Sequence, residues 1–223
     1  MTNWFLITTR SIGYPQPESN FAYITKTYDT SNACKTCNIG LTQKDEFRFA
    51  KEPHAKNNQF LGLNWVFDQV FVRQLVKDVF EQENVSGIDF SRPVLHKTSL
   101  PMDGIYQLRV NNLLTSGLLT ENLNPEICEL PKNPESLKFL TAIKSKLVEG
   151  PFCGQLKYNL PQDDNCLKIK SVALDGKPDF VRLGYSFGSG GNAQKPILVS
   201  ERVKQLIDRE KWRGVFLQPI ELV

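Results

Sequence analysis

Apolar residues recur along this chain with two periods, and each period predicts a different kind of element. Short runs that are dense in bulky apolar residues, or that alternate aromatic with polar residues, predict strands. Longer segments with apolar residues at every third or fourth position predict helices with one buried face. Strands are expected at residues 4–9, 21–27, 105–110, 155–158, 180–185 and 215–220.

Three segments have the helical period. The first covers residues 65–82 and follows Asn64, whose side chain suits an N-cap. The second covers residues 136–148 and ends before Gly150, and the third covers residues 200–210. Their predicted buried faces are, in order, Phe67, Val70, Phe71, Leu75 and Val79; Leu137, Leu140, Ile143 and Leu147; and Val203, Leu206 and Ile207.

Strands and helices are mixed along the chain, with no low-complexity linker and no recognisable internal repeat. This pattern predicts an α+β fold: a mixed or antiparallel sheet with about three helices and a zinc-knuckle-like turn. We expect residues 1–223 to form a single domain, with two packed lobes that meet near residue 100 as the alternative.

Composition narrows the function only slightly. Of the 223 residues, 40% are hydrophobic and 23% charged, as in ordinary globular proteins. The net charge of +3 is mild and disfavours a dedicated nucleic-acid binder. The opening residues 1–7 lack the basic region and apolar core of a signal peptide, and no run approaches the ~18 apolar residues that cross a membrane. We therefore expect a cytoplasmic protein whose five cysteines stay reduced.

Two of the cysteines form the motif Cys34-Lys35-Thr36-Cys37, which Asn38-Ile39-Gly40 follows. Two thiolates on a tight turn can supply half of a tetrahedral zinc site. A second such motif would complete the site, but Cys153 has Gly150 where its partner cysteine is expected. A redox role is the weaker alternative, because a redox Cys-x-x-Cys begins a helix and this one leads toward a strand-like segment.

Several short motifs occur in an order that resembles the double-CxxCG motif proteins, a family that includes immunity proteins of Myxococcus-type polymorphic toxin systems. The resemblance implies a cytoplasmic protein that binds and neutralises a cognate toxin, with zinc linking the two cysteine motifs. The residues that carry it are Cys34-Lys35-Thr36-Cys37 with Ile39-Gly40, residues 43–48, residues 63–68 with Phe71-Val72, Phe152-Cys153-Gly154, residues 187–191, residues 197–200 and Gly214-Val215.

The chain departs from the family pattern at Asn38 and at Gly150. The metal ligands that remain are Cys34, Cys37 and Cys153. The fourth ligand is His54, Cys166 or water, and the alternative to a zinc site is a metal-free packed turn. Cys128 and, outside that role, Cys166 are interpreted as buried or incidental thiols.

No catalytic motif is recognisable, so we expect a non-enzymatic binding protein with a protein partner. The alternative is a zinc-ribbon-type protein associated with nucleic acid, because basic residues surround the cysteine motif. They are Lys35, Lys44, Arg48, Lys51 and Lys56. The glycine-rich residues 188–191 lack the further residues of a nucleotide-binding loop and are interpreted as a turn between two strands.

Overall fold

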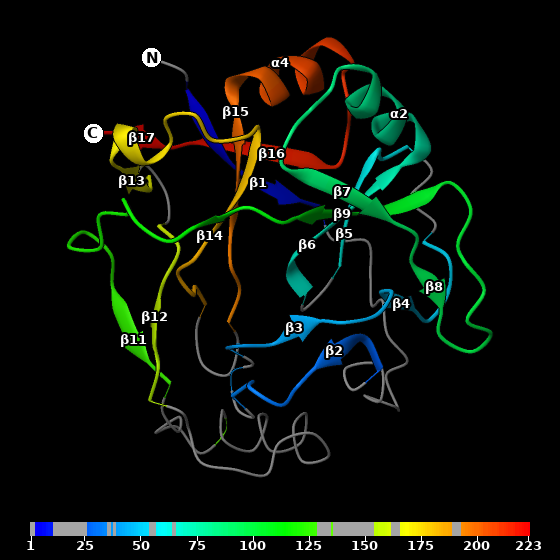
Figure 1. Cartoon of the computed structure of the whole chain (residues 1–223), viewed down its shortest axis with the longest axis horizontal. Coiled ribbons are helices and arrows are strands. Elements are labelled where there is room, and N and C mark those ends of the chain that lie inside the picture. Colours follow the sequence, from blue (N-terminus) through cyan, green and yellow to red (C-terminus); the bar gives the residue numbers. More distant parts are fainter. Residues whose placement is uncertain are drawn as a thin grey trace.

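The structure is a computed structural model, and it describes residues 3–10, 26–34, 37, 39–53, 57–63, 66–128, 135, 154–161, 166–188 and 193–223. Two sheets form its centre (Figure 1). The five-stranded sheet has the order β10 (Leu113–Leu114), β14 (Phe180–Leu183), β15 (Ile197–Ser200), β1 (Trp4–Thr9) and β16 (Val215–Pro219). The four-stranded sheet has the order β5 (Phe60–Leu63), β6 (Val66–Arg73), β9 (Ile105–Val110) and β7 (Ile88–Ser91).

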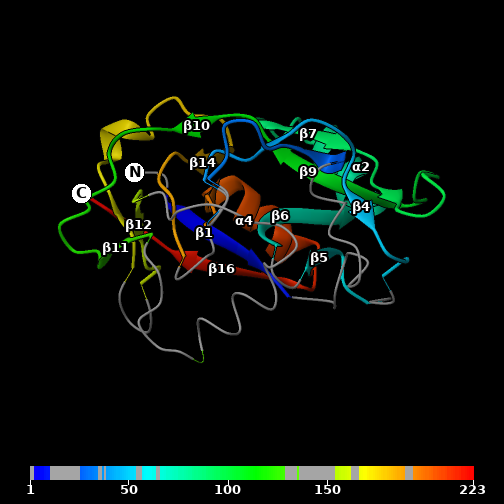
Figure 2. The ribbon, with the colours of Figure 1, turned by 90° about the horizontal axis from the view of Figure 1, so that it is seen from below.

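Two helices, α2 (Gln74–Gln82) and α4 (Glu201–Arg209), lie side by side on one side of the molecule (Figures 1 and 2). Short elements complete the described part. They are the pairs β2 (Tyr28–Asp29) with β3 (Thr42–Gln43), β4 (Arg48–Phe49) with β8 (Val94–Leu95), β11 (Pro125–Ile127) with β12 (Leu156–Tyr158) and β13 (Lys168–Ile169) with β17 (Glu221–Leu222), and the 3-10 turn η1 (Ser171–Ala173).

The predicted α+β class is confirmed, and so is a mixed sheet, since β10 pairs with β14 in parallel and the other pairs of that sheet are antiparallel. The expected number of helices was wrong, because the described residues form two α-helices rather than about three. Residues 136–148, the second predicted helix, lie outside the described residues. No helix in the described ranges combines the length and the apolar character needed to cross a bilayer.

The helix predicted over residues 65–82 was wrong in its first half. Residues 66–73 form the strand β6, and only Gln74–Gln82 is helical. Strand β6 lies between β5 and β9 in its sheet, and both of its faces are covered. Val70 and Val72 belong to the core between the units, and Phe71 belongs to the core on the opposite face. A strand buried on both faces is continuously apolar, which imitates a wide helical face. Leu75, predicted to face inward, is 54% exposed.

Most of the other described predictions agree with the structure. Strands occur at β1, β9, β12, β14 and β16 within two residues of the expected bounds, and α4 buries Val203, Leu206 and Ile207 as expected. Of the strand expected at residues 21–27, residues 21–25 lie outside the described residues. Residues 26 and 27 are helical, so the prediction was wrong there, and the strand β2 begins only at Tyr28.

Each sheet contains the same arrangement of four strands and one helix. We call β5, β6, α2, β7 and β9 unit A, and β14, β15, α4, β16 and β1 unit B. In unit A the helix α2 connects β6 to β7, and in unit B the helix α4 connects β15 to β16. An antiparallel strand, β9 in unit A and β1 in unit B, lies between the two strands that the helix connects. The chain therefore has an internal duplication of structure, which its sequence does not show as a recognisable repeat.

The correspondence holds residue by residue. Gly87 corresponds to Gly214, which stands 127 positions later, and their φ angles are 87° and 86°. The preceding Asn84 and Lys211 have φ angles of 52° and 53°. Cross-strand pairs also correspond, since the pairing of Phe71 with Gln107 in unit A matches that of Leu198 with Leu6 in unit B.

The units interlock through their glycine turns. The Phe60 N–H donates to the Arg213 carbonyl at 3.1 Å, and the Phe180 N–H donates to the Ser86 carbonyl at 3.1 Å. A Cβ at Gly214 would lie 2.2 Å from the Phe60 carbonyl oxygen, and one at Gly87 would lie 2.4 Å from that of Phe180. These reciprocal contacts relate the units by an approximate two-fold axis.

One core lies between the units and takes corresponding residues from both. Phe5, Val199, Val203 and Ile207 of unit B correspond to Tyr106, Val72, Val76 and Phe80 of unit A, and all eight are buried there. Two further cores cover the outer faces, one on each unit. The core over unit A includes Tyr28, Phe47 and Phe49, and it holds the segment with the cysteine motif against the sheet.

Candidate metal centre

The cysteine motif lies in the loop that connects β2 to β3, and we call residues 34–40 the knuckle. The Cys34 N–H donates to the Ile39 carbonyl at 2.8 Å, which closes the turn. Gly40 has a φ of 91°, and a Cβ there would lie 2.5 Å from the Asn32 carbonyl oxygen. Only glycine fits this position without a shift of the backbone.

The approach to the knuckle is also fixed by a hydrogen bond. The Ser31 N–H donates to the Asp29 carboxylate at 2.9 Å, and this bond lowers the pKa of Asp29 below its ordinary value. An Asp side chain that accepts from the backbone two residues later makes an Asx turn. The turn directs the chain from β2 into the knuckle.

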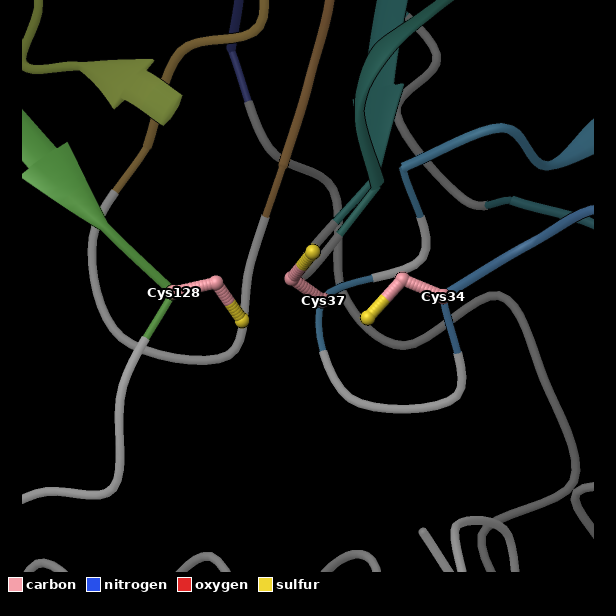
Figure 3. Close-up of side chains that lie close together, drawn as sticks. All are labelled: Cys34, Cys37 and Cys128. Carbon is pink, nitrogen blue, oxygen red and sulfur yellow. The ribbon is translucent and has the colours of Figure 1, made fainter. Parts of the chain in front are cut away.

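A third thiol comes from a distant part of the chain. Strands β11 and β12 form a two-stranded antiparallel element, which we call the ribbon, and Cys128 follows its strand β11. The Cys128 N–H donates to the Gln155 carbonyl at 3.1 Å, so the backbone pairing of β11 with β12 continues as far as Cys128. Figure 3 shows the Cys128 side chain pointing toward the knuckle.

The Sγ atoms of Cys34, Cys37 and Cys128 lie within 4.8 Å of one another. Two thiolates on one tetrahedral zinc ion, with Zn–S bonds of about 2.3 Å, lie roughly 3.8 Å apart. Side-chain rotations that bring the sulfur atoms closer together by about an ångström therefore suffice to place all three on one ion. Cys37 and Cys128 are 0% and 1% exposed, and Cys34 is half-buried.

The ribbon has an inverted polarity. Its inner face carries Cys128 and Lys157, which are buried, whereas Ile127 and Leu156 on the outer face are 50% and 47% exposed. Tyr158, on the same face as Leu156, packs against Tyr185 and Phe187 at the edge of the core over unit B. The ribbon is therefore held to unit B by apolar contacts at Tyr158, while its other face presents the Cys128 thiol to the knuckle.

The donor set fits a soft metal. Thiolates select zinc, copper(I) and iron–sulfur clusters among the biological metals, and three thiolates with one further ligand make an ordinary structural zinc site. The structure thus supports a possible metal site at the knuckle, with a third ligand, Cys128, that sequence analysis interpreted as incidental.

The other predicted ligands have separate outcomes. Cys153 and His54 lie outside the described residues. Cys166 is described, but it precedes β13, where its Sγ lies 3.9 Å from Glu221 Oε2, and it does not belong to the group of three thiols. The four described cysteines, Cys34, Cys37, Cys128 and Cys166, form no disulfide among themselves.

A buried network of side-chain amides fixes the knuckle to unit A. Gln107 is 0% exposed and exchanges two hydrogen bonds with Gln43 of β3, at 2.9 and 2.7 Å. Its Nε2 also donates to Gln69 at 2.7 Å, and its Oε1 accepts from the Ser91 hydroxyl at 3.4 Å. The corresponding residue of unit B is Leu6, so this polar network is specific to the unit that carries the knuckle.

The remaining candidates are less suited to chemistry. Phe187 and Gln194, on either side of the glycine-rich residues 188–191, form an antiparallel bridge, as expected for a connecting turn. Residues 189–192 lie outside the described part. His96 Nδ1 is buried without a hydrogen-bond partner in the described part of the chain. Burial lowers the pKa of His96, and the nearby cations Lys26 and Arg48 lower it further.

No protein-family model matches the chain, and no curated protein is significantly similar to it.

Proposed function

We propose that this protein is a non-enzymatic binding protein that neutralises a cognate toxin by direct contact, and that a structural zinc ion ties its knuckle to its ribbon. The grouping of Cys34, Cys37 and Cys128 carries the metal part of the proposal. The order of motifs that resembles the double-CxxCG family supports the toxin-binding part.

The burial of the thiols favours a structural rather than a reactive role. A nucleophilic or redox cysteine needs solvent access, but Cys37 and Cys128 have almost none. Structural zinc sites are closed in this way, and their metal contributes directly to folding. When bound, the ion would add coordinate bonds between the knuckle and the ribbon.

We propose Cys153 as the fourth ligand. It stands two residues before Gln155, whose carbonyl accepts from Cys128. With Cys153, the site would join one thiol pair from the knuckle to one from the two sides of the ribbon.

Metal analysis tests the structural part. Protein purified without added zinc should contain one zinc per chain, and the Cys34→Ser variant should contain much less. A matched Cys166→Ser variant should keep the metal, because Cys166 lies outside the group of thiols. Wild-type protein that contains and binds no zinc would contradict this part of the proposal.

Co-expression tests the toxin-binding part. We expect the full chain to protect a host from the toxin encoded beside its gene and to co-purify with that toxin. Absence of both binding and protection would contradict an immunity role. Salt-sensitive binding to DNA or RNA would instead favour the nucleic-acid-associated alternative, because contacts to phosphates weaken steeply with salt.

A further inference from the structure

A fully buried lysine lies on the face of the ribbon that carries Cys128. Lys157 is 0% exposed, and its Nζ lies 3.6 Å from Glu126 Oε1 on the facing strand. Cys128 follows Glu126 by two residues, and its backbone bond to Gln155 continues the pairing of the strands. Paired residues and alternate residues of a strand share a face, so Lys157, Glu126 and Cys128 project to the same side.

The register brings the lysine near the cluster of thiols. Lys157 and Cys128 are diagonal neighbours across the ribbon, a relation in which the residues are about 7–8 Å apart and long side chains reach one another. Lys157 has no exposed surface, so its ammonium does not extend into solvent. It stays on the inner side of the ribbon, which faces the knuckle.

The negative charge of a zinc–thiolate site would explain why a lysine is buried beside Cys128. A zinc ion with three thiolates has a net charge of −1, and with four it has −2. Burying that charge is costly unless an opposite charge lies nearby. Lys157 is shielded from water, and the side chain of its partner Glu126 is 31% exposed. A buried ammonium on the face that carries Cys128 supplies such an opposite charge.

We infer that Lys157 is the counter-charge of the cysteine site, a positioning residue that stabilises the metal-bound thiolates without binding the metal. This inference rests on the proposed zinc site. It gives the buried lysine a function beyond its ion pair with Glu126. We expect the Lys157 ammonium to strengthen zinc binding and the Glu126 carboxylate not to strengthen it.

Metal titration of the full-length protein tests the inference. Zinc affinity is measured by competition with a chromophoric chelator, and cobalt(II) binding by the thiolate charge-transfer bands. Partners of this kind typically change metal affinity 10–100-fold. We expect Lys157→Met to weaken zinc binding by about that factor and to move the cobalt bands to lower energy, since the thiolates lose a positive neighbour.

Matched variants separate this role from a merely structural one. Lys157→Arg keeps the charge and should bind zinc nearly as tightly as the wild type. Glu126→Gln leaves the ammonium and should not weaken binding. If Lys157→Met does not fold, the double variant with Glu126→Gln removes both charges together and should show the same loss of affinity.

The outcomes are distinguishable. If the wild type binds one zinc and Lys157→Met binds it equally well with unshifted cobalt bands, the inference is wrong and the zinc site stands. Equal losses in Lys157→Met and Glu126→Gln would reduce the lysine to a partner in an ion pair and also overturn the inference. If the wild type binds neither zinc nor cobalt, the inference and the proposed metal site fail together.

Discussion

Replacing Cys128 by alanine should remove most of the stability that zinc gives to this protein. Cys128 is 1% exposed and belongs to the group of three thiols, whereas Cys166 precedes β13 and lies outside that group. Cys166→Ala is therefore a matched control, because it removes the same atom from a place where no metal is expected.

The expected magnitude follows from the separation of the ligands along the chain. Cys37 and Cys128 are 91 residues apart, and in the unfolded chain a metal that joins them must close that loop. The chain-entropy relation for a cross-link puts this cost between about 4 and 5 kcal/mol. The folded protein already holds the thiols together, so zinc binds it more tightly than the unfolded chain by about this amount.

Urea unfolding with equimolar zinc, and again with excess chelator, measures the effect. Zinc should raise the free energy of unfolding of the wild type and of Cys166→Ala by about 4–5 kcal/mol. For Cys128→Ala the gain should fall below about 1 kcal/mol, since a site with one thiolate fewer is not filled at equimolar zinc. A zinc-dependent gain in Cys128→Ala as large as in the wild type would refute the reasoning.

Three further predictions concern the scaffold. His96 has a pKa below its ordinary value of 6.5, so the unfolded chain takes up the proton first, and the free energy of unfolding should fall as the pH drops below about 6.5. Urea unfolding between about pH 7.5 and 5.5 should show a shallower fall in His96→Gln, and an equal slope would contradict the assignment. Gln107→Leu removes the hydrogen bonds that Gln107 makes with the Gln43 and Gln69 amides, which should cost about 1–3 kcal/mol in chemical unfolding, and an unchanged midpoint would show that the network is dispensable. Gly214→Ala should lower the melting temperature more than Gly176→Ala, because both have positive φ but only at Gly214 would the Cβ meet backbone, and similar losses would argue against the interlock of the units.

Local patterns predicted the elements whose burial is one-sided. The helix α4 has apolar residues at helical spacing and a polar remainder, and its bounds and buried face agree with the prediction. Strand β6 was misread because tertiary contacts on both sides of it bury consecutive residues, from Val70 to Val72. No local period distinguishes such a strand from the first turns of a buried helix.

The third thiol could not be predicted from spacing. Cys128 reaches the knuckle only because β11 pairs with β12 and the ribbon packs beside the loop between β2 and β3. The one local signal was the inverted alternation of Ile127 with its neighbours, which is weak in a segment of three residues. The duplication escaped notice for a similar reason, since the units keep size and polarity at matching positions more often than identity.

The two units also differ from each other at identifiable places. Reciprocal contacts at Gly87 and Gly214 constrain both units alike, so the shared core leaves little room for a difference between them. The difference lies on the outer faces, where Gln107 of unit A replaces the apolar Leu6 of unit B and holds β3 in place. The knuckle and the ribbon are additions to the duplicated scaffold, and both meet at the cysteines. A binding function that distinguishes this chain from a bare scaffold should therefore depend on these additions, and variants there should affect binding before they affect the shared core.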